Sequence, residues 1–107
     1  MFIFDLTYQK PLSEVERFLP DHIRFLDEHY EKGLFLCSGR KVPRTGGIIL
    51  CNCHDMEAAA SIMKQDPFYR EGIADYKIIE FIPSKSSDLV QKALSQGDSA
   101  KECGPGP

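Results

Sequence analysis

The sequence predicts one α+β domain whose elements follow one another in the order β-α-β-β-α-β. Three patterns in its 107 residues lead to this prediction. The first eight residues alternate between large apolar side chains and smaller or polar ones, as a strand with one buried face does. Two longer segments repeat apolar residues at helical spacing. Between and after these segments lie short apolar runs, at 34–39, 46–53 and 74–83.

The first strand, residues 1–8, and the helix that follows it are bounded by clear local signals. One face of the strand carries its large side chains, Phe2, Phe4, Leu6 and Tyr8. Ser13 followed by Glu16 has the spacing of a capping box, which predicts that the first helix begins there. Pro20 is expected to kink this helix or restart it at Asp21, and Gly33 is expected to end it.

The two central strands, 34–39 and 46–53, are joined by the polar loop RKVPRT. Both are nearly continuous apolar runs, which is typical of strands in a sheet that is covered on both faces. We therefore expect both faces of this sheet to be covered.

The second helix is expected to begin after Asp55, since aspartate commonly caps helix N-termini. It should end around Asp66, because Pro67 disfavours helical dihedrals in the residue before it. The stretch DPFYREGI is predicted to be a turn or a short irregular helix. The last strand, 74–83, is closed by Pro83.

This order of elements is the ferredoxin-like arrangement, with a four-stranded antiparallel sheet. We assign residues 1–84 to this domain and 85–107 to a C-terminal extension. Residues 86–96 are expected to form a short amphipathic helix, and the tail GDSAKECGPGP is expected to be disordered. The apolar side of that helix carries Leu89, Val90, Ala93 and Leu94.

The charge and hydropathy of the chain exclude several classes of protein. A net charge of -3 argues against a nucleic-acid binder, which needs a concentrated basic surface. No stretch approaches the ~18 apolar residues of a membrane span, and the N-terminus lacks a signal-peptide pattern. We expect a soluble, cytoplasmic protein with no membrane partner. The strand GGIILCNC lacks the stacking aromatics of RNA-recognition domains, and the first loop lacks the arginine of acylphosphatases.

The cysteines do not indicate a metal site or a disulfide framework. Cys37, Cys51, Cys53 and Cys103 are expected to be reduced, because nothing in the sequence indicates export. The run CNCH could hold two or three metal ligands, but no second Cys/His cluster of suitable spacing exists. No nucleotide-binding fingerprint is present either, so we expect neither a metal nor a cofactor.

Three polar residues from distant parts of the sequence are expected to meet at one end of the fold. They are His22 in the first helix, Ser38 at the end of the second strand and Asp66 after the second helix. Right-handed crossovers put both helices on one face of the sheet, as neighbours. A carboxylate bound to one imidazole nitrogen leaves the other nitrogen to take or give a proton. A buried pair that merely joins two helices is the alternative, and the spacing leaves both open.

Two further groups of residues have competing interpretations. Arg40, Lys41 and Arg44 either attract an anionic substrate or form a solvated loop surface. His29 lies two turns beyond His22 on the same helix, so packing or a dimer contact is its favoured role.

Two segments, TYQKPLSEVERFLPDHIRFLDEHYEKGLFLCSGRKVPRTGGIIL and QDPFYREGIADYKIIEFIPSK, resemble the YciI-like, or YCII-related, proteins. The resemblance covers about residues 1–85, and its most specific parts are HIRFL, the strand end SG, VPRTGG and DPFYREGIADY. It implies that two copies pair their sheets into a dimeric α+β barrel. It also implies a catalytic dyad with a nearby serine, which in this sequence are His22, Asp66 and Ser38.

The chain departs from the family pattern at two positions near the implied site. Arg40 follows Gly39 where relatives commonly carry proline, and Tyr69 stands where relatives often carry another histidine. We assign Arg40, Arg44 and Tyr69 to substrate binding.

These observations together predict a cofactor-independent enzyme of lyase or isomerase type. His22 and Asp66 would carry out acid–base chemistry on a small cyclic or aromatic oxygenated metabolite, in a homodimer or a higher homo-oligomer. The alternative is a non-catalytic dimeric module that binds a small ligand or another protein.

Overall fold

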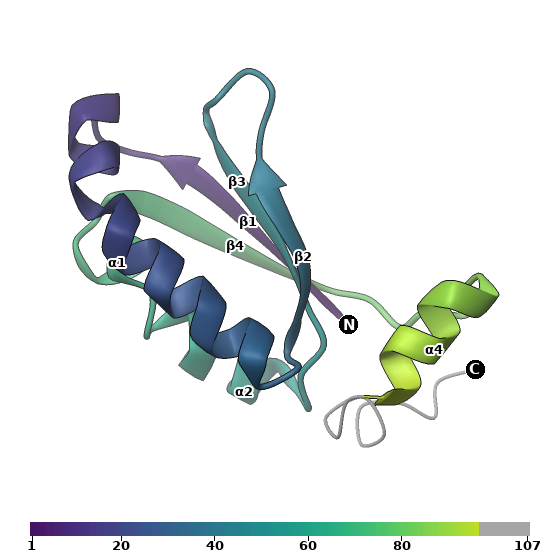
Figure 1. The fold of residues 1–107 in the computed structure, drawn as a ribbon. Helices are drawn as coiled ribbons and strands as arrows, with labels where there is room; N and C mark the ends of the chain where they lie inside the picture. The colour runs from purple at the N-terminus through teal and green to yellow at the C-terminus, as the bar shows by residue number, and fades with distance from the viewer. Residues whose placement is uncertain (97–107) are drawn as a thin grey trace.

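The computed structural model describes residues 1–96, and its elements follow the predicted order with two short helices added (Figure 1). They are β1 (Phe2–Tyr8), α1 (Leu12–Glu31), β2 (Phe35–Arg40), β3 (Gly46–Cys51), α2 (Met56–Met63), α3 (Pro67–Arg70), β4 (Ala74–Glu80) and α4 (Asp88–Gln96). The short helix expected at 86–96 is therefore present as α4. The tail expected to be disordered, 97–107, lies outside the described residues.

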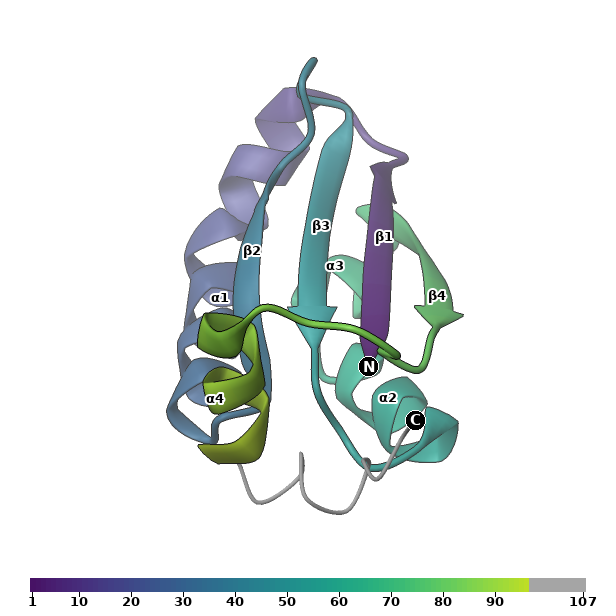
Figure 2. The ribbon, with the colours of Figure 1, turned by 90° about the vertical axis from the view of Figure 1, so that its right-hand side faces the viewer.

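The four strands form one antiparallel sheet in the order β2-β3-β1-β4. Helices α1, α2 and α3 all lie on one face of it, and α4 lies in front of the other face (Figure 2). The predicted α+β fold with a four-stranded antiparallel sheet is confirmed. In this fold β1 is central, so the residues of α1 and α3 that face the sheet meet above it.

Helix α1 begins differently from the sequence expectation. It starts at Leu12 with Pro11 as its capping residue, and no side chain caps its N-terminus. The predicted capping box is therefore wrong. Ser13 lies inside the first turn, and the Glu16 carboxylate pairs with the Arg44 guanidinium instead. A tertiary ion pair thus takes the carboxylate that the local motif would use.

Pro20 and Gly33, two residues with predicted roles in α1, lie in the middle of this helix and just after its end. The helix is continuous through Pro20, so of the two expected outcomes, a kink or a restart at Asp21, the restart does not occur. Gly33 ends it as predicted, with a φ of 77° that favours glycine. The Gly33 N–H donates to the Tyr30 carbonyl and the Leu34 N–H to the His29 carbonyl, both at 3.0 Å. This is a Schellman motif, which satisfies the last carbonyls of the helix.

Two aspartates cap helices in the second half of the domain. Asp55 caps α2 as predicted, accepting from the Ala58 N–H at 2.8 Å. The expectation that α2 ends at Asp66 is wrong, because α2 ends at Met63. Asp66 instead caps the next helix, α3, by accepting from the Phe68 N–H at 2.9 Å.

The strands that flank β1 end where β1 itself ends. Phe2 pairs with Cys51 of β3 on one side and with Glu80 of β4 on the other. Both strands were predicted to run further, to residues 53 and 83. Regular strand pairing stops at Phe2, the first residue of β1, although the Phe81 N–H still donates to the Met1 carbonyl at 2.9 Å.

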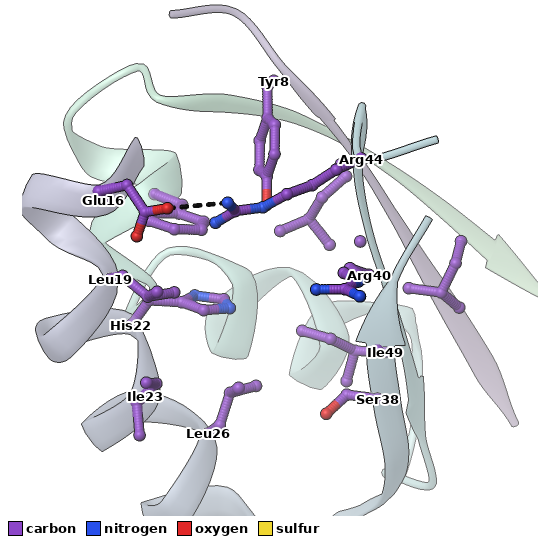
Figure 3. A pocket seen from close by; sticks show the side chains of 16 residues that line it. Tyr8, Glu16, Leu19, His22, Ile23, Leu26, Ser38, Arg40, Arg44 and Ile49 are labelled. Atoms are coloured by element: carbon purple, nitrogen blue, oxygen red, sulfur yellow. Dashed lines mark hydrogen bonds and ion pairs between the residues drawn. The ribbon is translucent and has the colours of Figure 1, made fainter. Parts of the chain in front are cut away.

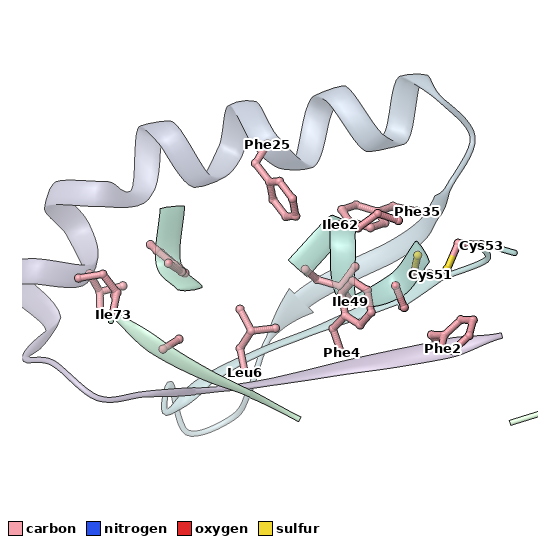
Figure 4. Packing of buried hydrophobic residues seen from close by; sticks show 14 residues of the cluster. Phe2, Phe4, Leu6, Phe25, Phe35, Ile49, Cys51, Cys53, Ile62 and Ile73 are labelled. Atoms are coloured by element: carbon pink, nitrogen blue, oxygen red, sulfur yellow. The ribbon is translucent and has the colours of Figure 1, made fainter. Parts of the chain in front are cut away.

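The hydrophobic core lies between the sheet and helices α1 to α3 (Figure 4). Phe2, Phe4 and Leu6 point from β1 toward the helices, and Phe25 of α1 points back at them. At one end of the sheet, β1 and β3 approach so closely that a Cβ on Gly46 would lie 1.8 Å from the Leu6 carbonyl oxygen. Glycine is therefore required there for steric reasons.

Among residues 1–96 of one chain, packed helices cover one face of the sheet, and the other face keeps exposed apolar side chains. The expectation of two covered faces is therefore met on one side. Ile48 and Ile79 on the other face are 37% and 39% exposed. Helix α4 lies nearby, yet its Leu89 is 79% exposed. Across residues 1–96, no helix combines the length and the apolar character needed to cross a membrane.

Candidate active site

A cavity of about 550 Å³ opens between α1 and the sheet (Figure 3). Helix α1 lines it with apolar residues on both sides of His22, and β2 and the loop after it line the opposite wall. The polar side chains at its surface are Tyr8, Glu16, His22, Ser38, Arg40 and Arg44. Four of the six predicted site residues line this cavity: His22, Ser38, Arg40 and Arg44. A fifth, Asp66, contacts His22.

His22 and Asp66 are in direct contact, as the topology predicted. The His22 Nδ1 lies 2.9 Å from the Asp66 Oδ1. Asp66 is completely buried and His22 nearly so. Because a carboxylate only accepts hydrogen bonds, the His22 Nδ1–H donates, and in the neutral imidazole the Nε2 carries the lone pair. The imidazole is therefore held in the tautomer that a general base needs.

The segment Asp66–Pro67–Phe68 fixes both the position and the orientation of His22. Pro67 occupies the first turn of α3, where its restricted φ suits a helix start, and Asp66 caps that helix. The Phe68 ring then stacks on the imidazole with a centroid distance of 4.0 Å and an angle of 4°. One face of the His22 ring is covered, and its rotation is restricted by the bond to Asp66.

A tyrosine that sequence reasoning missed completes the surroundings of Asp66. The Tyr76 hydroxyl donates to the Asp66 Oδ2. Burial, followed by the charge of Asp66 and this hydrogen bond, raises the pKa of Tyr76 far above its ordinary value. Tyr76 pairs with the buried Leu6 and so faces the helices, where a phenol needs a polar partner. Sequence reasoning missed it because this strand register is visible only in the structure.

Ser38 lies across the cavity from this pair rather than beside it. It lines the cavity from β2, and its Oγ is 2.6 Å from the Tyr30 hydroxyl of α1. Of the three residues expected to meet, His22 and Asp66 are in contact. Ser38 lines the same cavity as His22 but bonds to Tyr30. Tyr30 was not predicted as a site residue, because this contact depends on how α1 packs against β2.

The two predicted arginines differ in their surroundings. Arg44 donates to the Glu16 carboxylate at 2.8 Å, and hydrogen bonds to Glu16 and then Tyr8 raise the pKa of Arg44. Its charge is thus already balanced by an acidic partner. Figure 3 shows the Arg40 guanidinium reaching into the cavity from the wall opposite His22.

Tyr69 and Lys41 lie away from the cavity lining. The Tyr69 ring packs edge-on against Tyr76 at a centroid distance of 6.0 Å. The Lys41 Nζ lies 2.6 Å from the Asp5 Oδ1. Substrate binding by Tyr69 stays a prediction.

His29, Cys51 and Cys53 are buried and do not line the cavity. His29 is buried, its Nδ1 bonds to the Phe25 carbonyl at 2.9 Å, and its ring stacks on Phe35, so the favoured packing role is confirmed. A hydrogen bond to Cys51 lowers the pKa of the Cys53 thiol. Among residues 1–96, no three His, Cys, Asp or Glu side chains are grouped as a metal site would need.

Comparison with known proteins gives a family and a fold. The model of the family described as "YCII-related domain" matches residues 1–82. No curated protein matches the chain. Among solved structures, the chain is similar to the 5-chloro-2-hydroxyhydroquinone dehydrochlorinase TftG from Burkholderia phenoliruptrix AC1100, in complex with 2,5-dihydroxybenzoquinone. The TM-score is 0.64 at 15% identity, over 83% of this chain and 98% of that one.

Proposed function

This chain belongs to the YCII-related domain family, and from that premise we propose that it is a cofactor-independent enzyme acting on a small cyclic or aromatic oxygenated metabolite. The reaction is of lyase or isomerase type. One observation carries the proposal: His22, paired with the buried Asp66, lines a cavity of about 550 Å³. That volume is within the roughly 300–1,000 Å³ of small-molecule sites.

In this proposal His22 moves the proton and Asp66 orients it. The Nε2 lone pair removes a proton from the substrate, and the resulting imidazolium is stabilised by the Asp66 carboxylate on Nδ1. In an isomerisation the proton returns at another atom of the substrate. In an elimination the electron pair left by the proton forms a double bond, and a leaving group departs with its own electron pair.

The opposite wall of the cavity would bind the oxygens of the substrate. The Arg40 guanidinium suits an ionised oxygen or a carboxylate, since it presents several donors in one plane. The Tyr30 phenol is the more acidic hydroxyl of its pair, so it favours donating to Ser38. Ser38 then keeps its own proton for a substrate oxygen.

The similarity to TftG supports a hydroxylated ring as the substrate class. That protein's name describes removal of hydrogen chloride from a chlorinated hydroxyhydroquinone, and its structure contains a dihydroxybenzoquinone. Loss of hydrogen chloride is an elimination, the lyase form of the chemistry proposed above.

We also propose that the protein forms a homodimer through the sheet face opposite α1. Ile3 pairs with Leu50 and Ile79, so three apolar side chains lie side by side on that face. Light scattering should give twice the chain mass for the wild type. Ile79→Asp should give a monomer, whereas Ile82→Asp, at an exposed apolar residue beyond β4, should leave the dimer intact. A wild-type monomer at high concentration would refute this proposal.

The function is tested by a panel of hydroxyquinones, hydroxylated aromatics and lactones, with metal chelator present. We expect the wild type to bind and convert at least one of them. His22→Gln should bind the same compound and lose activity by about 10²–10⁴-fold, the usual contribution of a positioned acid–base group. Binding without conversion by the wild type would favour the non-catalytic ligand-binding module instead.

A further inference from the structure

Tyr76 closes a chain of side-chain hydrogen bonds that reaches the cavity from inside the fold. Its hydroxyl donates to one oxygen of Asp66, and the other oxygen of Asp66 accepts from the His22 imidazole and the Phe68 N–H. The three side chains come from β4, the start of α3 and the middle of α1. Tyr76 itself does not line the cavity.

We infer that Tyr76 is a positioning residue of the site, one that sets the strength of the Asp66–His22 hydrogen bond by holding the second oxygen of Asp66. It touches no substrate and acts only through the carboxylate. The inference rests on the proposed role of His22, because a bond that tunes the imidazole matters only if the imidazole transfers protons.

The packing around Tyr76 restricts the movement of its ring and keeps its hydroxyl directed at Asp66. Its ring packs edge-on against Phe4 at 5.7 Å and against Tyr69 at 6.0 Å. A buried carboxylate needs several donors to stay ionised. The Asp66 Oδ1 accepts from the Phe68 N–H and the His22 imidazole. The Asp66 Oδ2 accepts from the Tyr76 phenol, which is its donor among residues 1–96.

The physical consequence is a balance between the donors on the two oxygens of the Asp66 carboxylate. A donor on Oδ2 draws negative charge away from Oδ1, and this weakens the pull of Asp66 on the His22 proton. Without the phenol, Asp66 would attract that proton more strongly and favour the imidazolium.

Other charged groups also face His22, and they must be held constant in a test. Arg40 reaches toward it from β2, and Glu16 with Arg44 forms an ion pair on the rim of the same cavity. None of them bonds to Asp66 in the described residues. Variants of Tyr76 leave all three side chains in place.

The experiment is an NMR titration of the His22 ring in the free protein, which needs no substrate. In Tyr76→Phe the His22 resonances should titrate at higher pH than in the wild type. Replacing Tyr76 by 3-fluorotyrosine, whose hydroxyl is a stronger donor, should move the titration to lower pH. Tyr69→Phe removes the same atom from the neighbouring ring and should leave the His22 titration unchanged.

The mediation by Asp66 is tested by repeating the change in Asp66→Asn. There Tyr76→Phe should have no effect on the His22 titration. An equal effect with and without the carboxylate would overturn the inference, as would a Tyr76→Phe protein that only loses stability. Failure of every compound in the panel would instead count against the proposed function, and the titration would still decide the role of Tyr76.

Discussion

The two walls of the cavity are built in different ways. The anchored wall is formed by His22 and Phe68, which line the cavity, and it is held from behind by Asp66 and Tyr76. It is largely buried, and hydrogen bonds and a ring stack join its side chains. The opposite wall (Ser38, Arg40 and Arg44) is set on β2 and the following loop, with Ser38 and Arg40 exposed. In the proposed function the two walls have different roles: His22 of the anchored wall transfers protons, and the exposed side chains of the opposite wall bind the substrate.

The largest effect is expected from the anchored wall. Asp66→Asn keeps the shape of the side chain but removes the negative charge that stabilises the His22 imidazolium. The amide can also donate to the His22 Nδ1 and so reverse the tautomer of the ring. We expect kcat to fall by about 10³-fold or more, in line with losses at catalytic His–carboxylate pairs. Steady-state kinetics on the compound identified from the panel measures this loss. Ser38→Ala is the comparison, and a larger fall in kcat for Ser38→Ala would reverse the assignment of the two walls.

The second effect concerns β3, the strand next to β2, which pairs with β1 at Gly46. Gly46→Ala would place a Cβ against the Leu6 backbone, so β1 and β3 would have to separate. We expect the free energy of unfolding to fall by about 2–4 kcal/mol, near the upper end for single substitutions. Gly39→Ala, where an added Cβ meets nothing within 4 Å, should change it by less than about 1 kcal/mol. Urea unfolding of the two variants checks the difference, and equal losses would contradict it.

The order of the elements could be predicted from hydrophobic periodicity, and the handedness of the connections allowed His22 and Asp66 to meet at one end of the fold. That the two residues form a pair was implied by the family resemblance. The tyrosine partners of Asp66 and Ser38 could not be predicted. Tyr76 and Tyr30 reach them only through the register of β4 and the packing of α1 on β2. The same limit explains the wrong capping box, since a local motif cannot show that Glu16 has a better partner in a distant loop.

The third effect separates the two arginines of the opposite wall. Arg40→Gln should raise KM for an anionic substrate about tenfold with little change in kcat, as expected when a charge-assisted hydrogen bond of about 1.5 kcal/mol is lost from binding. Arg44→Gln should raise KM less, because Glu16 already balances its charge. Kinetics at several salt concentrations measures both. If Arg44→Gln had the larger effect on KM, Arg44 rather than Arg40 would be the anion-binding residue.

The smallest effect is a dependence of stability on alkaline pH that belongs to the anchored wall. The folded state raises the pKa of Tyr76, chiefly by burial and then by the charge of Asp66, so the folded protein keeps this proton where the unfolded chain loses it. The stabilisation is complete below the unfolded pKa of about 10 and is lost as the pH rises above it. The loss approaches about 1.4 kcal/mol per pH unit for one proton. Tyr76→Phe lacks this proton, so it should be less stable than the wild type at pH 8, and the gap should narrow between pH 10 and pH 11. Urea unfolding at these pH values measures the gap. A gap that stays constant across this range would mean that the phenol ionises equally in both states, and the anchored wall would then lack the protonated donor that holds Asp66.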